Sequence, residues 1–255
     1  MKFNIITSFP KSGNTWVRYI IYDLFFNPQN KENDNSQNIK KFVPDLHAIK
    51  INHNQLVLDK VLKDKKIFLK SHLSYNQMLN YSMDKIILII RNPLDIFVSL
   101  YNFYNYDNSK KDELVSFFAK HHTLPVLKRF GFPTWSQHTN DWVDSKKNLH
   151  IVRYKSLIDN FDMEIQKLSQ YFDIVLSKEK LDHLKWNTTF TKLKNIEKEE
   201  KKNKSPGFFY NSMKKKAERY FMHVGKNDNY KNFLNEGQIL ILKKSFGNYI
   251  DKYNL

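Results

Sequence analysis

Residues 8–17, Ser-Phe-Pro-Lys-Ser-Gly-Asn-Thr-Trp-Val, decide the fold of this chain. They follow a short β-like run at residues 3–7 and lead into an amphipathic helix predicted for residues 16–25. A strand, a turn of small residues and a helix together bind phosphate well, because the N–H groups at the helix start point toward the anion. Lys11 adds a full positive charge, and Gly13 lets the backbone approach a ligand. The segment therefore predicts an anion-binding loop.

The order of residues in this loop differs from the P-loop of ATP- and GTP-binding enzymes. In that loop the Lys follows the last Gly of G-x-x-x-x-G-K-[ST]. Here Lys11 precedes Gly13, and no Gly stands five residues before Gly13. This order weakens a nucleotide-kinase interpretation but leaves it as an alternative. Ser12 and Thr15 add hydroxyl donors, and Trp16 could either stack on a nucleobase or lie in the core.

The length and composition of the chain limit the classes of protein to which it can belong. With 255 residues, of which 41% are hydrophobic, the chain is long enough for a single α/β domain over residues 1–255. The absence of Cys excludes disulfides and thiolate metal sites. The apolar start is too short for a signal peptide, and the longest aliphatic run, residues 86–90, is far short of a membrane span. We therefore expect a cytoplasmic protein with no membrane contact.

The charge balance raises the question of nucleic-acid binding. The formal net charge is +16, from 42 Lys and Arg against 26 Asp and Glu. Such a charge is typical of proteins that bind nucleic acid. However, the lysines are scattered and form no stripe along one helix, and a small polyanionic ligand would explain a local excess equally well. We expect no nucleic-acid partner, retain a basic nucleic-acid-binding protein as an alternative, and leave the oligomeric state open.

Short apolar strands alternate with amphipathic helices along the chain. After the first strand, the pattern predicts strands at residues 66–70, 85–90 and 149–153. The alternation indicates a central parallel sheet with right-handed crossovers, flanked by helices. Helices are predicted at residues 46–62, 93–106, 112–121, 135–145, 161–172, 178–184 and 235–250.

Two polar stretches are predicted to lie outside these elements. Residues 27–38 are rich in Asn and contain Pro28, which is typical of an exposed loop. Residues 195–204 are nearly all Lys, Glu and Asn. That composition fits a solvated helix end or a mobile loop, and alternatively a lid that orders over a ligand.

Two further segments place polar residues at the carboxyl ends of predicted strands, where ligands bind in open α/β sheets. Arg91 ends one strand and offers a planar fork for phosphate, and Ser99 lies about two turns into the next helix. Lys70 and His72 end another strand, and a His there can accept a proton near neutral pH. Taken singly, Arg91 also fits a surface ion pair and His72 a structural residue.

Together these segments resemble the cytosolic-type sulfotransferases, which transfer a sulfuryl group from 3′-phosphoadenosine 5′-phosphosulfate (PAPS). Residues 10–16 read Pro-Lys-Ser-Gly-Asn-Thr-Trp and residues 70–73 read Lys-Ser-His-Leu. Residues 91–99 read Arg-Asn-Pro-x-Asp-x-x-Val-Ser. Their order and spacing agree with the family motifs PKSGTTW, KTHL and RNPKDxxVS. Weaker matches follow at residues 134–142, 152–157, 188–190 and 223–233, so the resemblance spans nearly the whole chain.

The resemblance implies a role for each matching residue. His72 would take the proton from the acceptor as general base, Lys11 would stabilise the leaving phosphate, and Lys70 would lie beside the transferring sulfuryl group. PAPS would be the donor, with a P-loop-like loop around its 5′-phosphosulfate, and no metal is required. The residues expected to hold the donor are Lys11, Ser12, Gly13, Asn14, Thr15, Trp16, Arg91, Ser99, Tyr154, Phe190 and Gly225.

The acceptor is only broadly defined by the sequence. The resemblance implies that Phe103 lines its pocket. Phe9 and Tyr75 also lie near the predicted pocket, where aromatic residues suit a flat or apolar molecule, although they fit the core equally well. We expect a small-molecule acceptor that offers a hydroxyl or an amine, as in secondary metabolism.

The C-terminal part departs from the family pattern. Where the family has Arg-Lys-Gly, this chain has His223-Val224-Gly225, so two cations for the 3′-phosphate are absent. The usual dimerisation motif near the C-terminus is not recognisable.

Overall fold

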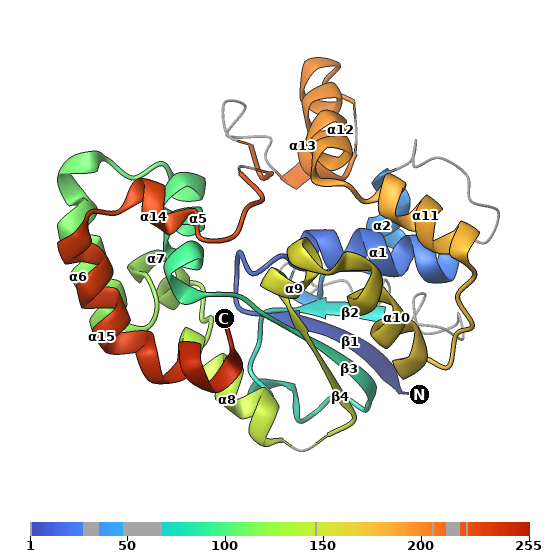
Figure 1. The fold of residues 1–255 in the computed structure, drawn as a ribbon, viewed down its shortest axis with the longest axis horizontal. Helices are drawn as coiled ribbons and strands as arrows, with labels where there is room; N and C mark the ends of the chain where they lie inside the picture. The colour runs from blue at the N-terminus through green and yellow to red at the C-terminus, as the bar shows by residue number, and fades with distance from the viewer. Residues whose placement is uncertain are drawn as a thin grey trace.

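A four-stranded parallel sheet lies at the centre of the molecule (Figure 1). The structure, a computed structural model, describes residues 2–27, 36–47, 68–145, 147–205, 207–212, 220–222 and 224–255. The strand order is β2-β1-β3-β4, and the expected α/β class with a central parallel sheet is confirmed. The strands are β1 (Phe3–Ser8), β2 (Phe68–Ser71), β3 (Met83–Ile90) and β4 (Leu149–Arg153).

Strand β3 is apolar throughout its second half because both of its faces are covered. Ile86, Leu88 and Ile90 pack into one core cluster, while Ile87 and Ile89 pack into another. Successive side chains of a strand point to opposite faces, so a continuous apolar run supplies two cores at once. The result is a three-layer arrangement with the sheet in the middle.

Helices form the two outer layers (Figure 1). The cluster on one face holds buried residues of α1 (Asn14–Phe26), α9 (Tyr154–Asp159), α10 (Phe161–Tyr171) and α11 (Lys178–Asn187). The cluster on the other face holds buried residues of α5 (Pro93–Tyr104), α6 (Lys111–His121), α7 (Pro125–Arg129), α8 (Trp135–Asp144), α14 (Tyr230–Phe233) and α15 (Glu236–Tyr253).

The predicted helices are present where the structure describes them, with shifted ends. Helix α5 stops at Tyr104, before the predicted residue 106, because Asn105 takes the left-handed conformation (φ 51°) and its N–H bonds back to Tyr101 and Asn102. Helix α15 continues past the predicted end at residue 250, as far as Tyr253. Local propensity locates a helix well, but its last turn depends on the cap.

The polar stretch 195–204 belongs mostly to a helix. Helix α12 (Phe190–Lys202) buries Leu193, Glu197 and Glu200 and leaves its other faces to solvent. Of the two structures expected for residues 195–204, the helix end is therefore present for residues 195–202, and the mobile loop is wrong. The burial of one face was not expected, because carboxylates on that face break the apolar periodicity by which sequence analysis finds a buried helix face. Figure 1 shows α12 standing above the sheet beside α13 (Phe208–Ser212).

Two predictions fall largely outside the described residues. Of the helix expected at residues 46–62, only residues 46–47 are described, and of the loop expected at residues 27–38, residues 28–35 are not. The end of that loop is instead the start of α2 (Ser36–Phe42). Within the described ranges, no helix has both the length and the apolar character needed to cross a bilayer.

Candidate active site

The turn between β1 and α1 leaves its backbone open to a ligand. Gly13 starts the helix with φ +106°, and no side chain caps the first N–H groups. The ring of Tyr154 lies directly over Gly13, so that an added Cβ would stand 2.5 Å from a ring carbon. Both the conformation and the space therefore require glycine here. Lys11 is also left-handed, with φ 69°.

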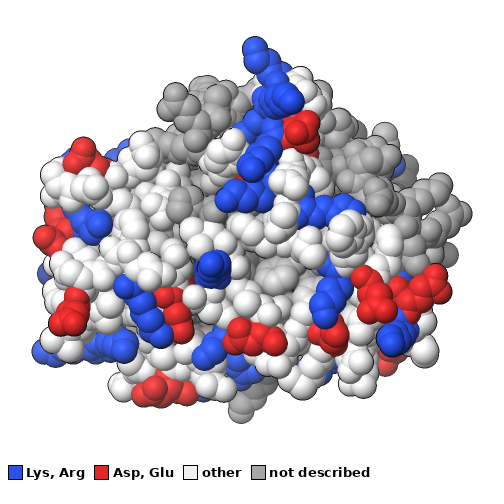
Figure 2. All heavy atoms as spheres, turned by 45° about the horizontal axis from the view of Figure 1, so that its top comes forward, with Lys and Arg blue, Asp and Glu red and all other residues white. Residues whose placement is uncertain are grey.

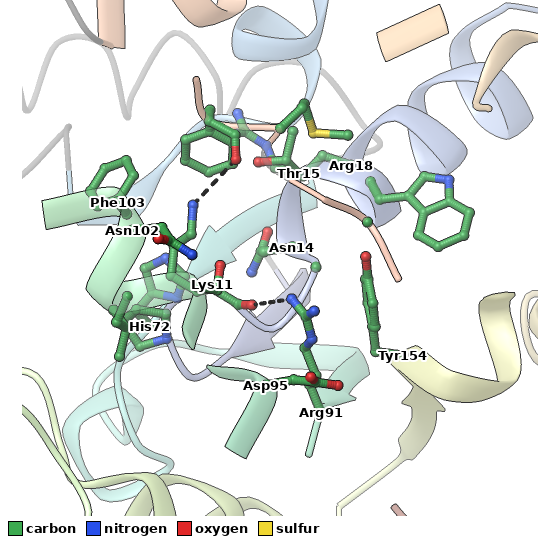
Figure 3. Close-up of a pocket in the computed structure, with 18 of the residues that line it drawn as sticks. Lys11, Asn14, Thr15, Arg18, His72, Arg91, Asp95, Asn102, Phe103 and Tyr154 are labelled. Carbon is green, nitrogen blue, oxygen red and sulfur yellow. Dashed lines mark hydrogen bonds between the residues drawn. The ribbon is translucent and has the colours of Figure 1, made fainter. Parts of the chain in front are cut away.

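A cavity of about 500 Å³ opens where β1, β2 and β3 end (Figure 3). This is the edge of a parallel sheet at which ligands bind, since the loops after neighbouring strands meet there. Ser12 lies buried beside the cavity, and its Oγ has no hydrogen-bond partner among the described residues. The predicted site residues that line the cavity are Lys11, Gly13, Asn14, Thr15, Trp16, Lys70, His72, Arg91, Ser99, Phe103, Tyr154, Phe190 and Gly225.

Two residues expected at the acceptor lie elsewhere. Phe9 is 1% exposed and belongs to the core cluster on the α5 side of the sheet. Tyr75 packs edge-on against Trp142, with ring centroids 5.5 Å apart. Neither residue lines the cavity, so neither is retained in the candidate site.

Lys11 reaches into the cavity between two aromatic rings (Figure 3). Its Nζ lies 4.3 Å from the ring centroid of Phe103 and 3.8 Å from that of Phe221, and donates to the carbonyl oxygen of Phe221 at 3.4 Å. Burial, reinforced by the charge of Arg91 and opposed by that of Glu197, lowers the pKa of Lys11 to about 7. An anion bound here would draw a proton onto this amine.

Arg91 ties the loop to the C-terminal part of the chain. Its guanidinium donates to the carbonyl oxygens of Lys11 (3.1 Å) and Lys226 (3.4 Å), and it lies 4.2 Å from the ring centroid of Tyr154. The buried Nε of Arg91 has no partner among the described residues. One N–H of this side chain is therefore available to an anion.

His72 is held as a neutral base. Its Nδ1 lies 2.6 Å from the carbonyl oxygen of Ser8. A carbonyl oxygen only accepts, so Nδ1 carries the proton and Nε2 keeps its lone pair. Burial and then the charge of Lys70 hold the pKa of His72 well below its usual range, although Asp45 acts in the opposite direction. The ring packs edge-on against Phe132, with centroids 5.6 Å apart.

Lys70 has a partner that sequence analysis did not find. Its Nζ lies 2.8 Å from Oδ2 of Asp45, which also lines the cavity. Burial lowers the pKa of Lys70, and Asp45 opposes the shift. Burial would raise the pKa of Asp45, but Lys70, His72 and Arg18 hold it below its ordinary value. A lone Asp in a segment that matches no motif gave no signal for this pairing.

Two buried carboxylates of α12 hold the segments that cover the cavity. Glu197 accepts from the backbone N–H groups of Phe221 and Met222, the latter at 2.8 Å. Glu200 accepts from the N–H groups of residues 208–210 at 2.7 to 3.1 Å. These bonds fix the position of Phe221, and through it the surroundings of Lys11.

The charge of the cavity favours an anion. Figure 2 shows basic side chains gathered where α12 projects, whereas elsewhere on this face Lys and Arg alternate with Asp and Glu. Within the described part of the chain, no cluster of His, Asp and Glu could hold a metal ion. The charged side chains that line the cavity are the cations Lys11, Arg18, Lys70 and Arg91 and the carboxylates Asp45 and Asp95.

Comparison with known proteins assigns the family. The model of the sulfotransferase domain family matches residues 4–254. The chain belongs to the sulfotransferase family. The predictions of the family, of the enzyme class and of PAPS as the donor are confirmed, so the chain is a PAPS-dependent sulfotransferase.

Similar proteins agree with this assignment. The sulfotransferase is 27% identical over 250 residues to mouse sulfotransferase 1 family member D1, covering 89% of this chain and 76% of the relative. It is 27% identical over 207 residues to rat sulfotransferase 1A1, covering 74% and 66%. Retinol dehydratase in a complex with retinol and PAP shares the fold, with a TM-score of 0.67 at 16% identity over 98% of this chain and 82% of that one. The chain thus spans between 66% and 82% of the length of these three proteins.

The residues present in the sulfotransferase fit its donor. The start of α1 has no side-chain cap, and Ser12 Oγ and Arg91 Nε have no hydrogen-bond partner among the described residues, so unused donors lie at and beside the cavity, as an anionic donor requires. Phe190 packs directly on the backbone of Gly225, since an added Cβ would stand 2.1 Å from its ring. Trp16 meets Tyr154 edge-on, with ring centroids 5.8 Å apart, so these two aromatic rings line the same part of the cavity.

Proposed function

We propose that this sulfotransferase moves a sulfuryl group from PAPS, in line, to a hydroxyl or amine of a small-molecule acceptor, with His72 as general base. The observation that carries the proposal is the bond of Nδ1 of His72 to Ser8, because it leaves Nε2 free to accept a proton at the cavity. The proposal covers one domain over residues 1–255, acting in the cytoplasm without nucleic-acid or membrane partners.

The donor would bind across the carboxyl edge of the sheet. The 5′-phosphosulfate would lie at the start of α1 and Lys11, where N–H groups and a cation converge. Arg91 and Ser99 would hold the 3′-phosphate, together with the backbone near Gly225. The adenine would lie among the rings of Trp16, Tyr154 and Phe190, all of which line the cavity.

The chemistry follows from where charge develops. The bond between sulfur and the bridging phosphate oxygen breaks as the bond between sulfur and the acceptor atom forms, and His72 takes the acceptor's proton on Nε2. The leaving product is adenosine 3′,5′-bisphosphate (PAP). Lys11, in its charged form, would meet the growing negative charge on the bridging oxygen, and Lys70 would lie beside the sulfuryl group. Such positioned charge contributes on the order of 10²–10³-fold in rate.

The acceptor side of the cavity is largely aromatic. Phe103, Phe130 and Phe132 line the cavity. Phe132 contacts the ring of His72, and the ring of His47 packs on Phe132 with centroids 5.0 Å apart. A flat, apolar body carrying one hydroxyl or amine fits this lining. This supports a small aromatic or alicyclic acceptor.

Two measurements test the proposal. PAP should raise the melting temperature of the protein more than ATP with Mg²⁺ does, because the latter lacks a 3′-phosphate for Arg91. Incubation with PAPS and a metabolite library, followed by mass spectrometry, should show a product heavier by one sulfuryl group. A larger stabilisation by ATP with Mg²⁺, or transfer of phosphate instead of sulfate, would contradict the proposal.

A further inference from the structure

The segment before the second strand is joined to Lys70 twice. Along the backbone, the N–H of Lys70 donates to the carbonyl oxygen of Pro44 at 2.9 Å, and Asp45 forms a parallel bridge with Lys70. Through the side chains, Oδ2 of Asp45 lies 2.8 Å from Nζ of Lys70. Residues 44–45 thus extend the sheet beyond β2 and place a carboxylate at the cavity, next to the site proposed for transfer.

We propose that Asp45 is a positioning residue of the transfer reaction: its carboxylate keeps the ammonium of Lys70 charged and aimed into the cavity beside His72 until the sulfonate of the donor replaces it. This inference rests on the proposed function. Asp45 itself takes no proton and forms no bond to the reacting atoms.

The charge of Lys70 depends on the ion pair more than the charge of Asp45 does. The side chain of Lys70 is 8% exposed and that of Asp45 is 29% exposed. A buried ammonium without a counterion tends to lose its proton, whereas a partly exposed carboxylate keeps its charge in water. Oδ1 of Asp45 also accepts the backbone N–H of His47 at 3.0 Å, so the carboxylate stays in place when Lys70 turns to the sulfonate.

Every charged group around the pair affects the pH dependence. The charge of Arg18 of α1 acts on both partners, and the charges of Lys70 and of His138 of α8 act on His72. The charge of Arg18 disfavours the protonated form of Lys70, and the charge of Lys70 disfavours that of His72. Among the charged groups named here, Asp45 alone favours the protonated form of both. Removal of its charge therefore lowers the pKa of Lys70, and lowers that of His72 as well. The alkaline limit of activity moves to lower pH, while the acid limit does not rise.

The test compares Asp45→Asn with wild type between pH 6 and 10, using PAPS and 2-phenylethanol, an aromatic alcohol that does not ionise in this range. We expect the alkaline limb of kcat to fall at a pH lower by about one to three units. The KM for the alcohol should change less than about twofold, because Asp45 acts through Lys70. Asp45→Glu should restore most of the wild-type profile.

Two controls separate this role from a structural one. Asp173→Asn removes an equivalent carboxylate, 2.7 Å from Lys85 but exposed and remote from the cavity, and should leave the profile unchanged. In Lys70→Arg, whose guanidinium does not lose its proton, adding Asp45→Asn should no longer move the alkaline limb. An equal loss at every pH, or an unmoved alkaline limb, would overturn the proposal.

A second readout needs no turnover and so separates this inference from the proposed function. Acetic anhydride labels only the neutral amine, and peptide mass spectrometry quantifies the label on Lys70. Labelling of Lys70 should begin at a lower pH in Asp45→Asn than in wild type and in Asp45→Glu. Identical labelling in all three would overturn the role of Asp45, even if PAP binding and sulfuryl transfer are both observed.

Discussion

The Nδ1 of His72, just after β2, lies 2.6 Å from the carbonyl oxygen of Ser8, the last residue of β1. The last residue of β1 thereby fixes the tautomer of His72, which follows the neighbouring strand β2. The adjacent pairing of β1 with β2, from Asn4 opposite Phe68 to Thr7 opposite Ser71, holds these two atoms in register. The proposed base is therefore held in its tautomer by the sheet edge itself.

Replacement of His72 by Ala should lower kcat by about 10²–10⁴-fold, because the acceptor's proton then has no positioned base. PAP should still bind, since its proposed contacts lie elsewhere. His121→Ala, an exposed histidine at the end of α6, is the matched control and should remain active. Because burial holds the pKa of His72 below its usual range, wild-type activity should persist on acidification to below pH 6.5. Near-wild-type turnover in His72→Ala would exclude it as the base.

Binding of PAP should take up a proton above pH 7. In the protein without a ligand, burial lowers the pKa of Lys11 to about 7. A bound anion raises this pKa, so the amine of Lys11 is neutral before binding above pH 7 and charged afterwards. At pH 8 we expect uptake of about one proton, measured by calorimetry in buffers of different ionisation enthalpy. Affinity should fall as the pH rises through this range. Lys11→Met should bind more weakly and take up no proton; uptake of equal size in both proteins would assign it to another group.

Substitution of Gly13 by Ala should damage donor binding and stability together. The left-handed φ of +106° and the ring of Tyr154 at 2.5 Å both oppose a Cβ. We expect a loss on the order of 2 kcal/mol in the free energy of unfolding, with PAP affinity reduced at least tenfold. Gly247→Ala makes the same change inside α15, where nothing lies within 4 Å, and should be neutral or slightly stabilising. Equal effects of the two substitutions would contradict the role of the turn.

Replacement of Glu197 by Ala should release the cover of the cavity. Two N–H groups, those of Phe221 and Met222, lose their acceptor, at a cost of about 2–4 kcal/mol to the local structure. Hydrogen exchange at these two residues should accelerate, and PAP affinity should fall. Glu199→Ala, at an exposed neighbouring position of α12, should change neither measurement. Unchanged exchange at Phe221 in Glu197→Ala would show that other contacts hold the cover.

Much of the site was predictable because its motifs are local. In residues 8–17, the order of Lys11, Gly13 and Trp16 sets the turn, since its backbone conformation depends on neighbouring residues. Parallel strands bring their carboxyl ends to one edge, so Lys70 and Arg91 could be assigned to the same site before their distance was known.

The errors have a common physical cause. Phe9 and Tyr75 were expected at the acceptor because they are aromatic and close in sequence to the loops, but the side chain of each packs on the apolar side of its own segment. Residues 195–204 were expected to be a solvated helix end or a mobile loop. Most of them form the end of α12, but its buried Glu197 and Glu200, which accept from backbone N–H groups, were not expected in a stretch without apolar periodicity.

The sequence by itself determined the parallel α/β fold, the anion-binding turn at Gly13 and the residues Lys11, His72 and Arg91, because each depends on short-range order along the chain. Only the tertiary structure decided which atoms of these residues are free, through contacts between distant residues. Asp45 meets Lys70 across 25 positions, and Lys11 meets the carbonyl of Phe221 across 210. Packing sets such contacts, and with them the protonation of the site, because burial and charged partners shift each pKa away from the value that residue type alone gives.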